Sequence, residues 1–317
     1  MEMIFSLGLL LGFFCQDSAK TENSSLELSL KSDQAEVGLG ENIQLEISLK
    51  NGGDRDQEIA SLLLEKRSLS LEILLPEAKA PFQYTRTQTD PHVAERLSLP
   101  VFSLKKGNAV NMCVRIPAIA VGDIQITAIY RGGDAEVRSS STKVSVGKSS
   151  RGDHLAAIVE IRNPKDQKVE AVSFQLLPAA APLNVINFIQ LASSGFYDGM
   201  IFHRIIRGSW IQSGCPYGLG IGGPGYAVDS EAEGQVEKHT PGTLSIAGFE
   251  KTGYTGSQFF VTLGTIPTLD GKFTVVGRVS SDDKMKFLKT LGRVDVDKNN
   301  DRPRKDVELV RIRIVVE

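Results

Sequence analysis

One stretch in the second half of the chain decides the fold: Phe196-Tyr-Asp-Gly-Met-Ile-Phe-His-Arg204-Ile-Ile-Arg-Gly-Ser-Trp-Ile-Gln212-Ser-Gly214. Side-chain alternation over Met200–Ile206 predicts a β-strand that carries Phe202, Arg204 and Ile206 on one face. A cation between apolar neighbours is costly unless it has a partner or a purpose. Arg204 is therefore the leading candidate for a functional residue.

A second stretch, Gly256-Ser-Gln-Phe-Phe-Val-Thr-Leu263, predicts another strand, with Gln258 and Phe260 on one face. Outward from these two stretches, the hydrophobic pattern predicts a β-rich region with two helices. The further strands are expected at Leu155–Arg162, Lys168–Leu177, Thr243–Ala247, Lys272–Val279 and Val307–Val316, and the helices at Pro182–Ser194 and Ser281–Leu291. We expect residues 154–317 to form a closed β-barrel capped by the two helices.

Other parts of this region carry matching motifs: Ala181-Pro-Leu-Asn-Val-Ile-Asn-Phe188, Gly242-Thr-Leu-Ser-Ile-Ala247, Leu269-Asp-Gly-Lys and Asp301-Arg-Pro303. In this order, and together with the two stretches above, they resemble the cyclophilin-type peptidyl-prolyl cis-trans isomerases. The resemblance covers roughly half of the chain, from about residue 154 to 317. It implies a cyclophilin-like barrel that isomerises X-Pro bonds of proline-containing polypeptides and needs no cofactor or metal.

The resemblance also implies roles for single residues. Arg204 matches the catalytic cation, and Gln212 matches the glutamine that binds the substrate backbone and orients the arginine. Phe260 matches the floor of the proline pocket and Leu269 its aliphatic wall. Further substrate-binding positions implied in the same way are Trp210, Gln258, Phe273, Gly248 and Ser209.

The sequence departs from the family pattern around the proline pocket. Ser209 stands where the family usually has a phenylalanine, Trp210 where it has a methionine, and Thr268 where some members have tryptophan. Loss of one aromatic wall removes roughly 1.5–3 kcal/mol of apolar burial. We therefore predict weakened proline binding with retained catalytic geometry; the alternative is a non-catalytic peptide-binding module on the same barrel.

Residues 26–147 show a different sequence pattern from the C-terminal half. Short runs of alternating apolar and polar residues, such as Ile43–Leu49 and Ile124–Tyr130, are separated by turn residues. This pattern predicts an immunoglobulin-like antiparallel β-sandwich, so that the chain as a whole is mostly β. Residues 148–153 are expected to be a polar linker. The partner of the sandwich is unknown, and a scaffold role in which the sandwich is the working part remains open.

The N-terminus, residues 1–25, resembles a leader and tether. Residues 4–14 form an apolar run that is too short to span a hydrocarbon core of about 30 Å comfortably but suits the central part of a signal peptide. Cys15 directly follows this run and is a candidate for lipidation, although Phe14 precedes it instead of a small residue. We expect an exported protein, periplasmic, cell-envelope or secreted, with membrane attachment only through the N-terminus. Cys113 and Cys215 are expected to be free.

Composition excludes other classes of function. The chain has 36 basic and 38 acidic side chains among 317 residues, and a net charge of -2 does not suit a nucleic-acid binder. Gly218-Leu-Gly-Ile-Gly-Gly223 satisfies a dinucleotide-binding pattern, but Pro224 cannot open the helix which that pattern needs. Asp295 to Asp301 has calcium-loop spacing without the turn glycine, so we interpret it as a polar loop.

Overall fold

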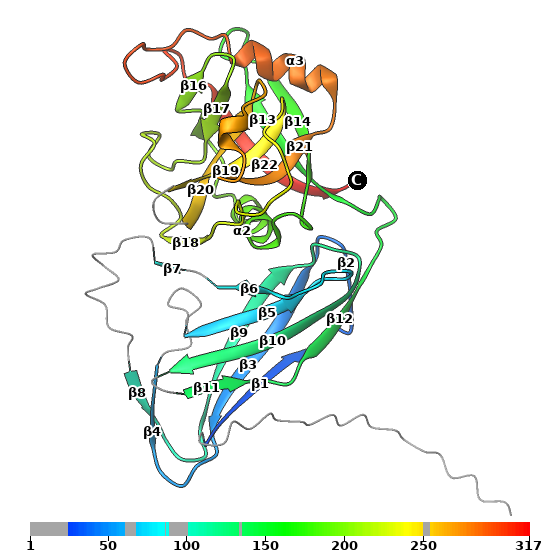
Figure 1. Ribbon diagram of the computed structural model, residues 1–317, viewed down its shortest axis with the longest axis vertical. Helices are drawn as coiled ribbons and strands as arrows, with labels where there is room; N and C mark the ends of the chain where they lie inside the picture. Colours follow the sequence, from blue (N-terminus) through cyan, green and yellow to red (C-terminus); the bar gives the residue numbers. More distant parts are fainter. Residues whose placement is uncertain (1–24, 61–67, 86, 89–100, 133–134, 250–253) are drawn as a thin grey trace, which may run out of the picture.

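The computed structural model describes residues 25–60, 68–85, 87–88, 101–132, 135–249 and 254–317. Two β-rich domains follow one another along the chain and lie in contact (Figure 1). The predicted leader, including Cys15, lies outside the described residues. Within those residues, no helix is long and apolar enough to cross a membrane. Cys113 and Cys215 are both free, as the sequence predicts.

The N-terminal domain contains two main sheets. The first has the order β1-β3-β9, and the second has the order β2-β12-β10-β5-β6 with β11 paired to β10. Their strands are β1 (Leu26–Ser32), β3 (Asn42–Asn51), β9 (Ala109–Pro117), β2 (Glu36–Gly38), β12 (Thr142–Gly147), β10 (Gly122–Gly132), β5 (Leu69–Leu74), β6 (Phe82–Tyr84) and β11 (Ala135–Arg138). A separate pair joins β4 (Gln57–Ala60) to β8 (Val101–Leu104).

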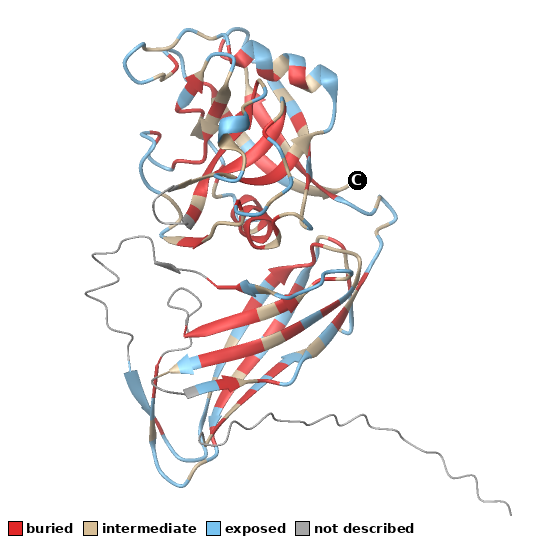
Figure 2. Cartoon of the chain, in the orientation of Figure 1, coloured by how far each residue is buried: buried red, intermediate tan, exposed pale blue. Residues whose placement is uncertain are grey.

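Alternation explains the core of this domain. In β3, Ile43, Leu45, Ile47 and Leu49 are fully buried while the residues between them are more exposed. Figure 2 shows the same alternation along most strands. The prediction of a purely antiparallel domain is wrong at one place, because β2 pairs with β12 in parallel. The immunoglobulin-like assignment stays a prediction.

The C-terminal domain is built on one 11-stranded sheet whose main path runs β15-β22-β13-β14-β21-β19-β20-β17-β16, with β18 on β20 and β7 on β18. Its strands are β13 (Leu155–Arg162), β14 (Val169–Leu176), β15 (Met200–Ile201), β16 (Arg204–Ile206), β17 (Trp210–Ser213), β18 (Tyr226–Asp229), β19 (Thr243–Phe249), β20 (Tyr254–Thr262), β21 (Thr274–Val279) and β22 (Glu308–Val316). Strand β7 (Thr87–Gln88) comes from the N-terminal half.

The predicted closed barrel is corrected to an open one, because β15 and β16 end the path and do not pair with each other. The reason lies between these two strands. The amide of Phe202 donates to the carbonyl of Val307 and that of Ile205 to the carbonyl of Asp301, so the backbone bonds to the 301–307 segment instead. The single strand predicted over Met200–Ile206 is therefore two short strands.

Two helices cover the sheet within the described residues, α2 (Pro182–Ser193) and α3 (Asp282–Leu291). Helix α2 starts with a proline in its first turn. The amides of Leu183 and Asn184, which have no carbonyl partner within the helix, donate to the carboxylate of Glu231, a residue distant in sequence. Burial raises the pKa of that carboxyl. Ser281 caps α3 by accepting from the amide of Lys284, as its position in the sequence indicates.

The two domains meet at α2, which faces the sandwich in Figure 1. The hydroxyl of Tyr84 donates to Oε1 of Gln190 at 3.0 Å, and Nε2 of Gln190 donates to the carbonyl of Arg115 at 3.0 Å. Beside this contact, β7 pairs with β18 and thereby adds a strand to the C-terminal sheet. Direct hydrogen bonds thus join the domains at two places.

Candidate active site

Three of the predicted site residues form a row across neighbouring strands. Arg204 of β16 lies opposite Gln212 of β17, and Gln212 lies opposite Phe260 of β20. Side chains at directly opposite positions stand on the same face of a sheet, about 4.5–5.5 Å apart at Cβ. The structure therefore brings together on one face the cation, the amide and the aromatic ring that the sequence analysis selected.

This face is the outer face of the sheet. In β20, Phe259 packs edge-on against Phe188, Tyr197 and Phe202 in the hydrophobic core. Its neighbour Phe260 points to the other side. The row therefore lies on the face of the sheet away from this core cluster.

Arg204 is half-exposed, with 45% of its side chain accessible. The prediction that it shares a face with buried Phe202 is wrong, because residues 202 and 203 interrupt the strand between β15 and β16 and the strand alternation does not continue through them. Its Nε and Nη2 atoms each lie 3.4 Å from Oδ2 of Asp301, and its guanidinium carbon lies 5.7 Å from the centroid of Trp210. A carboxylate and an aromatic ring thus hold the cation while it remains reachable.

Phe260 is only 4% exposed because other rings surround it. Trp210 lies 6.0 Å away, Phe273 packs edge-on at 5.4 Å, and His239 stacks at 5.9 Å with an interplanar angle of 13°. Edge-on and offset aromatic pairs at such distances are favourable. Phe260 therefore lies at the centre of an aromatic cluster beside the cation.

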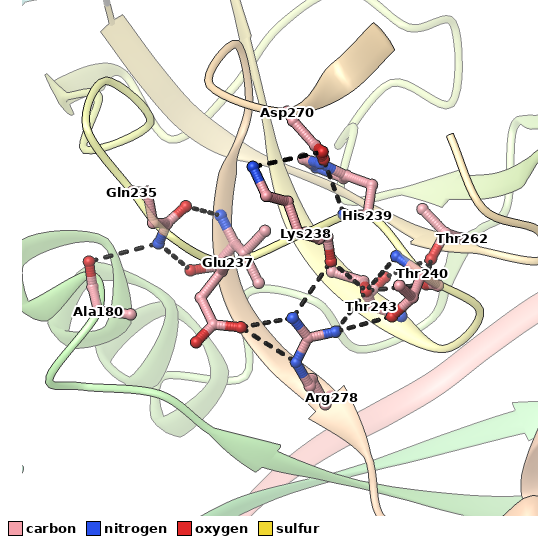
Figure 3. A network of polar contacts seen from close by, with 11 residues as sticks. Ala180, Gln235, Glu237, Lys238, His239, Thr240, Thr243, Thr262, Asp270 and Arg278 are labelled. Atoms are coloured by element: carbon pink, nitrogen blue, oxygen red, sulfur yellow. Dashed lines mark hydrogen bonds and ion pairs between the residues drawn. The ribbon is translucent and has the colours of Figure 1, made fainter. Parts of the chain in front are cut away.

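His239 is held from the far side of this cluster. Its backbone amide and Nδ1 lie 2.9 and 3.0 Å from Oδ1 of Asp270, the residue after Leu269 (Figure 3). The bond from the His239 amide is the main cause that lowers the pKa of Asp270. Burial lowers the pKa of His239, although Asp270 opposes the effect. A neutral imidazole is the form that suits stacking on a buried ring.

The loop that carries His239 is fixed by a polar network around Arg278. Its Nη1 donates to the hydroxyls of Thr240 and Thr243 at 3.0 Å, and its other side forms an ion pair with Glu237 (Figure 3). Gln235, two residues before Glu237, ties the same loop to the carbonyls of Ala180 and Val275. This loop therefore gives the aromatic cluster a rigid base.

Gln212 has a defined orientation. Its Nε2 donates to Oε1 of Gln258 at 3.0 Å, and Nε2 of Gln258 donates to the carbonyls of Gly220 and Gly222 at 3.0 and 3.1 Å. Because the amide of Gln212 donates in this direction, its carbonyl oxygen remains to orient a donor on the substrate or on Arg204.

The remaining predicted residues lie at the margin of the site. Ser209 is half-buried in the turn between β16 and β17, where its carbonyl accepts from the amide of Leu263 at 2.7 Å. Leu269 ends the short 3₁₀ turn Pro267–Leu269, and its carbonyl accepts from the amide of Phe273. Gly248 of β19 pairs with Thr255. Among the residues that the structure describes, no side-chain hydrogen bond or ring contact joins these three to the row, so their substrate roles stay predictions.

His203, directly before the catalytic candidate, is only 6% exposed, and neither ring nitrogen has a hydrogen-bond partner among the described residues. Burial, together with the nearby cations Arg302 and Arg204, lowers its pKa to about 4. The imidazole is therefore neutral at physiological pH and adds no charge beside Arg204.

The two rejected motifs have other roles in the structure. The glycines of the 218–223 segment are followed by a turn and β18, not by a helix. In the acidic loop, Asp301 pairs with Arg204, Asp295 with Arg304 and Asp306 with Arg302. Among the described residues, no group of three metal-ligating side chains is present.

Sequence reasoning missed three residues that hold the site in place: His239, Asp270 and Asp301. Two of them stood in quoted motifs, since Asp270 follows Leu269 and Asp301 opens the late Asp-Arg-Pro, while His239 lies three residues before the motif that begins at Gly242. The available signal was thus a motif match. Their contacts with Phe260 and Arg204 could not be found from spacing, because the partners are distant in sequence.

Comparison with known proteins agrees with this geometry. The family model described as cyclophilin type peptidyl-prolyl cis-trans isomerase/CLD matches residues 161–314. Peptidyl-prolyl cis-trans isomerase B of Bacillus subtilis (strain 168) is 48% identical over 126 residues, which are 39% of this chain and 85% of the relative. Peptidyl-prolyl cis-trans isomerase-like 1 of Aspergillus oryzae is 40% identical over 155 residues, or 48% of this chain and 94% of the relative.

Among solved structures, a cyclophilin type peptidyl-prolyl cis-trans isomerase of Cryptosporidium parvum matches 52% of this chain and 99% of its own, with 30% identity and a TM-score of 0.46. The extent of the sequence matches decides the assignment. Through its C-terminal half, the chain belongs to the cyclophilin-type peptidyl-prolyl cis-trans isomerases, and it is an enzyme of that kind.

Proposed function

We propose that the protein isomerises X-Pro bonds in exported polypeptides and so assists their folding outside the cytoplasm. The observation that carries the catalytic part of the proposal is the row Arg204, Gln212 and Phe260 on the open face of the sheet. Export is supported by the apolar run at residues 4–14, and anchoring by Cys15 directly after it. The sandwich, which we propose to be immunoglobulin-like, would present the enzyme beyond the membrane surface.

The chemistry needs little beyond this row. The barrier to rotation is about 18–20 kcal/mol because the C–N bond has partial double-bond character. A gain from roughly 0.01 to 10 per second needs only about 4 kcal/mol. One well-placed donor supplies about 2.7–4 kcal/mol in a preorganised site.

Each residue has a part in this reaction. As the prolyl C–N bond twists, its nitrogen becomes pyramidal and regains a lone pair. In the proposed mechanism Arg204 donates a hydrogen bond to that nitrogen, Gln212 holds the substrate backbone, and the aromatic cluster at Phe260 accepts the proline ring. All proton positions on the protein remain unchanged, because Arg204 acts as a permanent donor.

A protease-coupled assay on an Ala-Pro-Phe peptide tests the reaction. We expect Arg204→Ala to lower kcat/KM by about 100-fold or more, since the donor to the twisted amide is lost. Wild-type activity no higher than that of the variant would contradict catalysis and favour the non-catalytic peptide-binding module, which the missing aromatic side chain at Ser209 also suggests. Intact mass of the mature protein tests cleavage of the leader and lipidation of Cys15.

A further inference from the structure

The loop between β17 and β18 presents large apolar side chains to solvent next to the catalytic row. Tyr217, Leu219 and Ile221 are 72%, 65% and 66% exposed, and we call these three residues the apolar ridge. They alternate with Gly218, Gly220 and Gly222. In Figure 2 this loop is largely coloured as exposed. Ordinary burial would place the apolar residues inside and the small ones outside.

Of the three glycines, Gly218 is buried, whereas Gly220 and Gly222 are exposed. A Cβ at Gly218 would lie 3.1 Å from Ile201, and one at Gly222 would lie 2.7 Å from the ring of Tyr217. Both glycines also have positive φ, +61° and +97°, where a side chain is strained. The loop thus packs closely against the domain at Gly218, and the ridge side chains are exposed to solvent.

The loop is held in this position by bonds from the site itself. Nε2 of Gln258, the residue that orients Gln212, donates to the carbonyls of Gly220 and Gly222. Nη1 of Arg302 donates to the carbonyl of Gly218 at 2.8 Å, and Arg302 directly follows the partner of Arg204. The ridge is therefore an anchored continuation of the catalytic face.

Large exposed apolar side chains that lie together mark interaction surfaces, whereas apolar side chains scattered singly over a surface are ordinary. The segment from Cys215 to Ala227 contains no charged residue, so it offers nothing to a charged partner. We infer that the apolar ridge binds bulky apolar side chains of the substrate polypeptide close to the prolyl bond. This inference rests on the proposed function and names its substrate class: prolines in hydrophobic segments of unfolded chains.

Two peptides with the same Ala-Pro core test the inference on the full chain, one flanked on both sides by Leu and Phe and the other by Ser and Gly. We expect the wild type to show the higher kcat/KM on the apolar peptide. The double variant Leu219→Ser/Ile221→Ser is expected to lose about fivefold or more on that peptide, and less than about twofold on the polar one. Tyr217 is left unchanged because its ring packs against Gly222.

Val169→Ser is the matched control, because Val169 is also an exposed apolar residue but lies at the start of β14. An equal loss on both peptides, or no loss on either, would overturn the inference. Concentration-dependent self-association of the wild type that the double variant abolishes, without a change in peptide preference, would assign the ridge to a second copy and also overturn it.

Peptide binding distinguishes a failure of the proposed catalysis from a failure of the proposed role of the apolar ridge. Trp210 is the single tryptophan and lies beside Phe260, so its fluorescence reports peptide binding. If the wild type does not isomerise either peptide, a preference for binding the apolar peptide that the double variant abolishes still supports the ridge. Equal binding of both peptides contradicts it.

Discussion

Oδ2 of Asp301 lies 3.4 Å from both Nε and Nη2 of Arg204, across 97 residues of sequence. Both side chains are partly exposed, so the pair contributes little to stability. Its consequence is geometric: the carboxylate on one side and Trp210 on the other restrict where the guanidinium can point. Asp301 is therefore a positioning residue for Arg204, the cation that we propose to be catalytic.

Asp301→Asn tests this role without disturbing the backbone. Asp301 has a φ of 58°, a conformation that asparagine tolerates better than alanine. We expect kcat/KM to fall about two- to fivefold, the size of a lost exposed ion pair, while the melting temperature stays unchanged. High salt is expected to lower the kcat/KM of the wild type toward that of the variant, because salt screens exposed ion pairs.

Asp297→Asn is the control for this variant. Asp297 lies in the same loop, but its carboxylate accepts from the amide of Asn299. An equal loss of activity in both variants would show that the loop as a whole matters and not the pair with Arg204.

Ser209→Phe tests the missing wall of the proline pocket. Ser209 contributes its carbonyl to the turn, which the substitution keeps. If the side chain borders the pocket as the family pattern implies, a phenylalanine adds roughly 1.5–3 kcal/mol of apolar contact and lowers KM about tenfold or more. The fluorescence of Trp210 measures the change in peptide affinity. Unchanged affinity would mean that Trp210 already fills this wall.

Features that depend on local sequence could be predicted, and features that depend on contacts between residues distant in sequence could not. The hydrophobic pattern placed β13 at Leu155–Arg162, because a strand that is buried on a sheet is encoded by its own residues. The open edge between β15 and β16 was missed, since it depends on bonds to the 301–307 segment. Arg204 and Phe260 were identified by motif. The exposure of Arg204 and its pair with Asp301 required the fold.

Gln190 joins the two domains, and its substitution is expected to loosen them. Its amide accepts from Tyr84 and donates to the carbonyl of Arg115. Each such bond contributes about 0.5–1.5 kcal/mol, so Gln190→Ala should reduce the free energy of unfolding by roughly 1–3 kcal/mol. Differential scanning calorimetry should then show the transitions of the domains moving apart.

Tyr84→Phe is the graded control, because it removes only the hydroxyl that Gln190 accepts from. We expect this variant to reduce the free energy of unfolding by about half as much as Gln190→Ala does. A double variant no less stable than Gln190→Ala would confirm that the two side chains act together. Additive losses would mean that they stabilise the protein independently.

The buried imidazole of His203 predicts a loss of stability in acid. Its folded pKa of about 4 lies below the ordinary value of 6.5, so the unfolded chain binds the proton more tightly. The stability that the neutral ring contributes is fully present above pH 6.5 and is lost as the pH falls toward 4. The full difference is roughly 3 kcal/mol, of which roughly 2 kcal/mol is lost by pH 5.

His203→Leu removes this proton-linked contribution while it keeps an apolar side chain in the site. Urea unfolding at pH 7.5, 6 and 5 should give a shallower loss of stability for the variant than for the wild type. Part of the slope remains, because the lowered pKa of His239 acts in the same direction. Parallel pH curves for wild type and His203→Leu would show that His203 binds a proton equally well in the folded and unfolded chains, and the account of a ring kept neutral by burial would then be wrong.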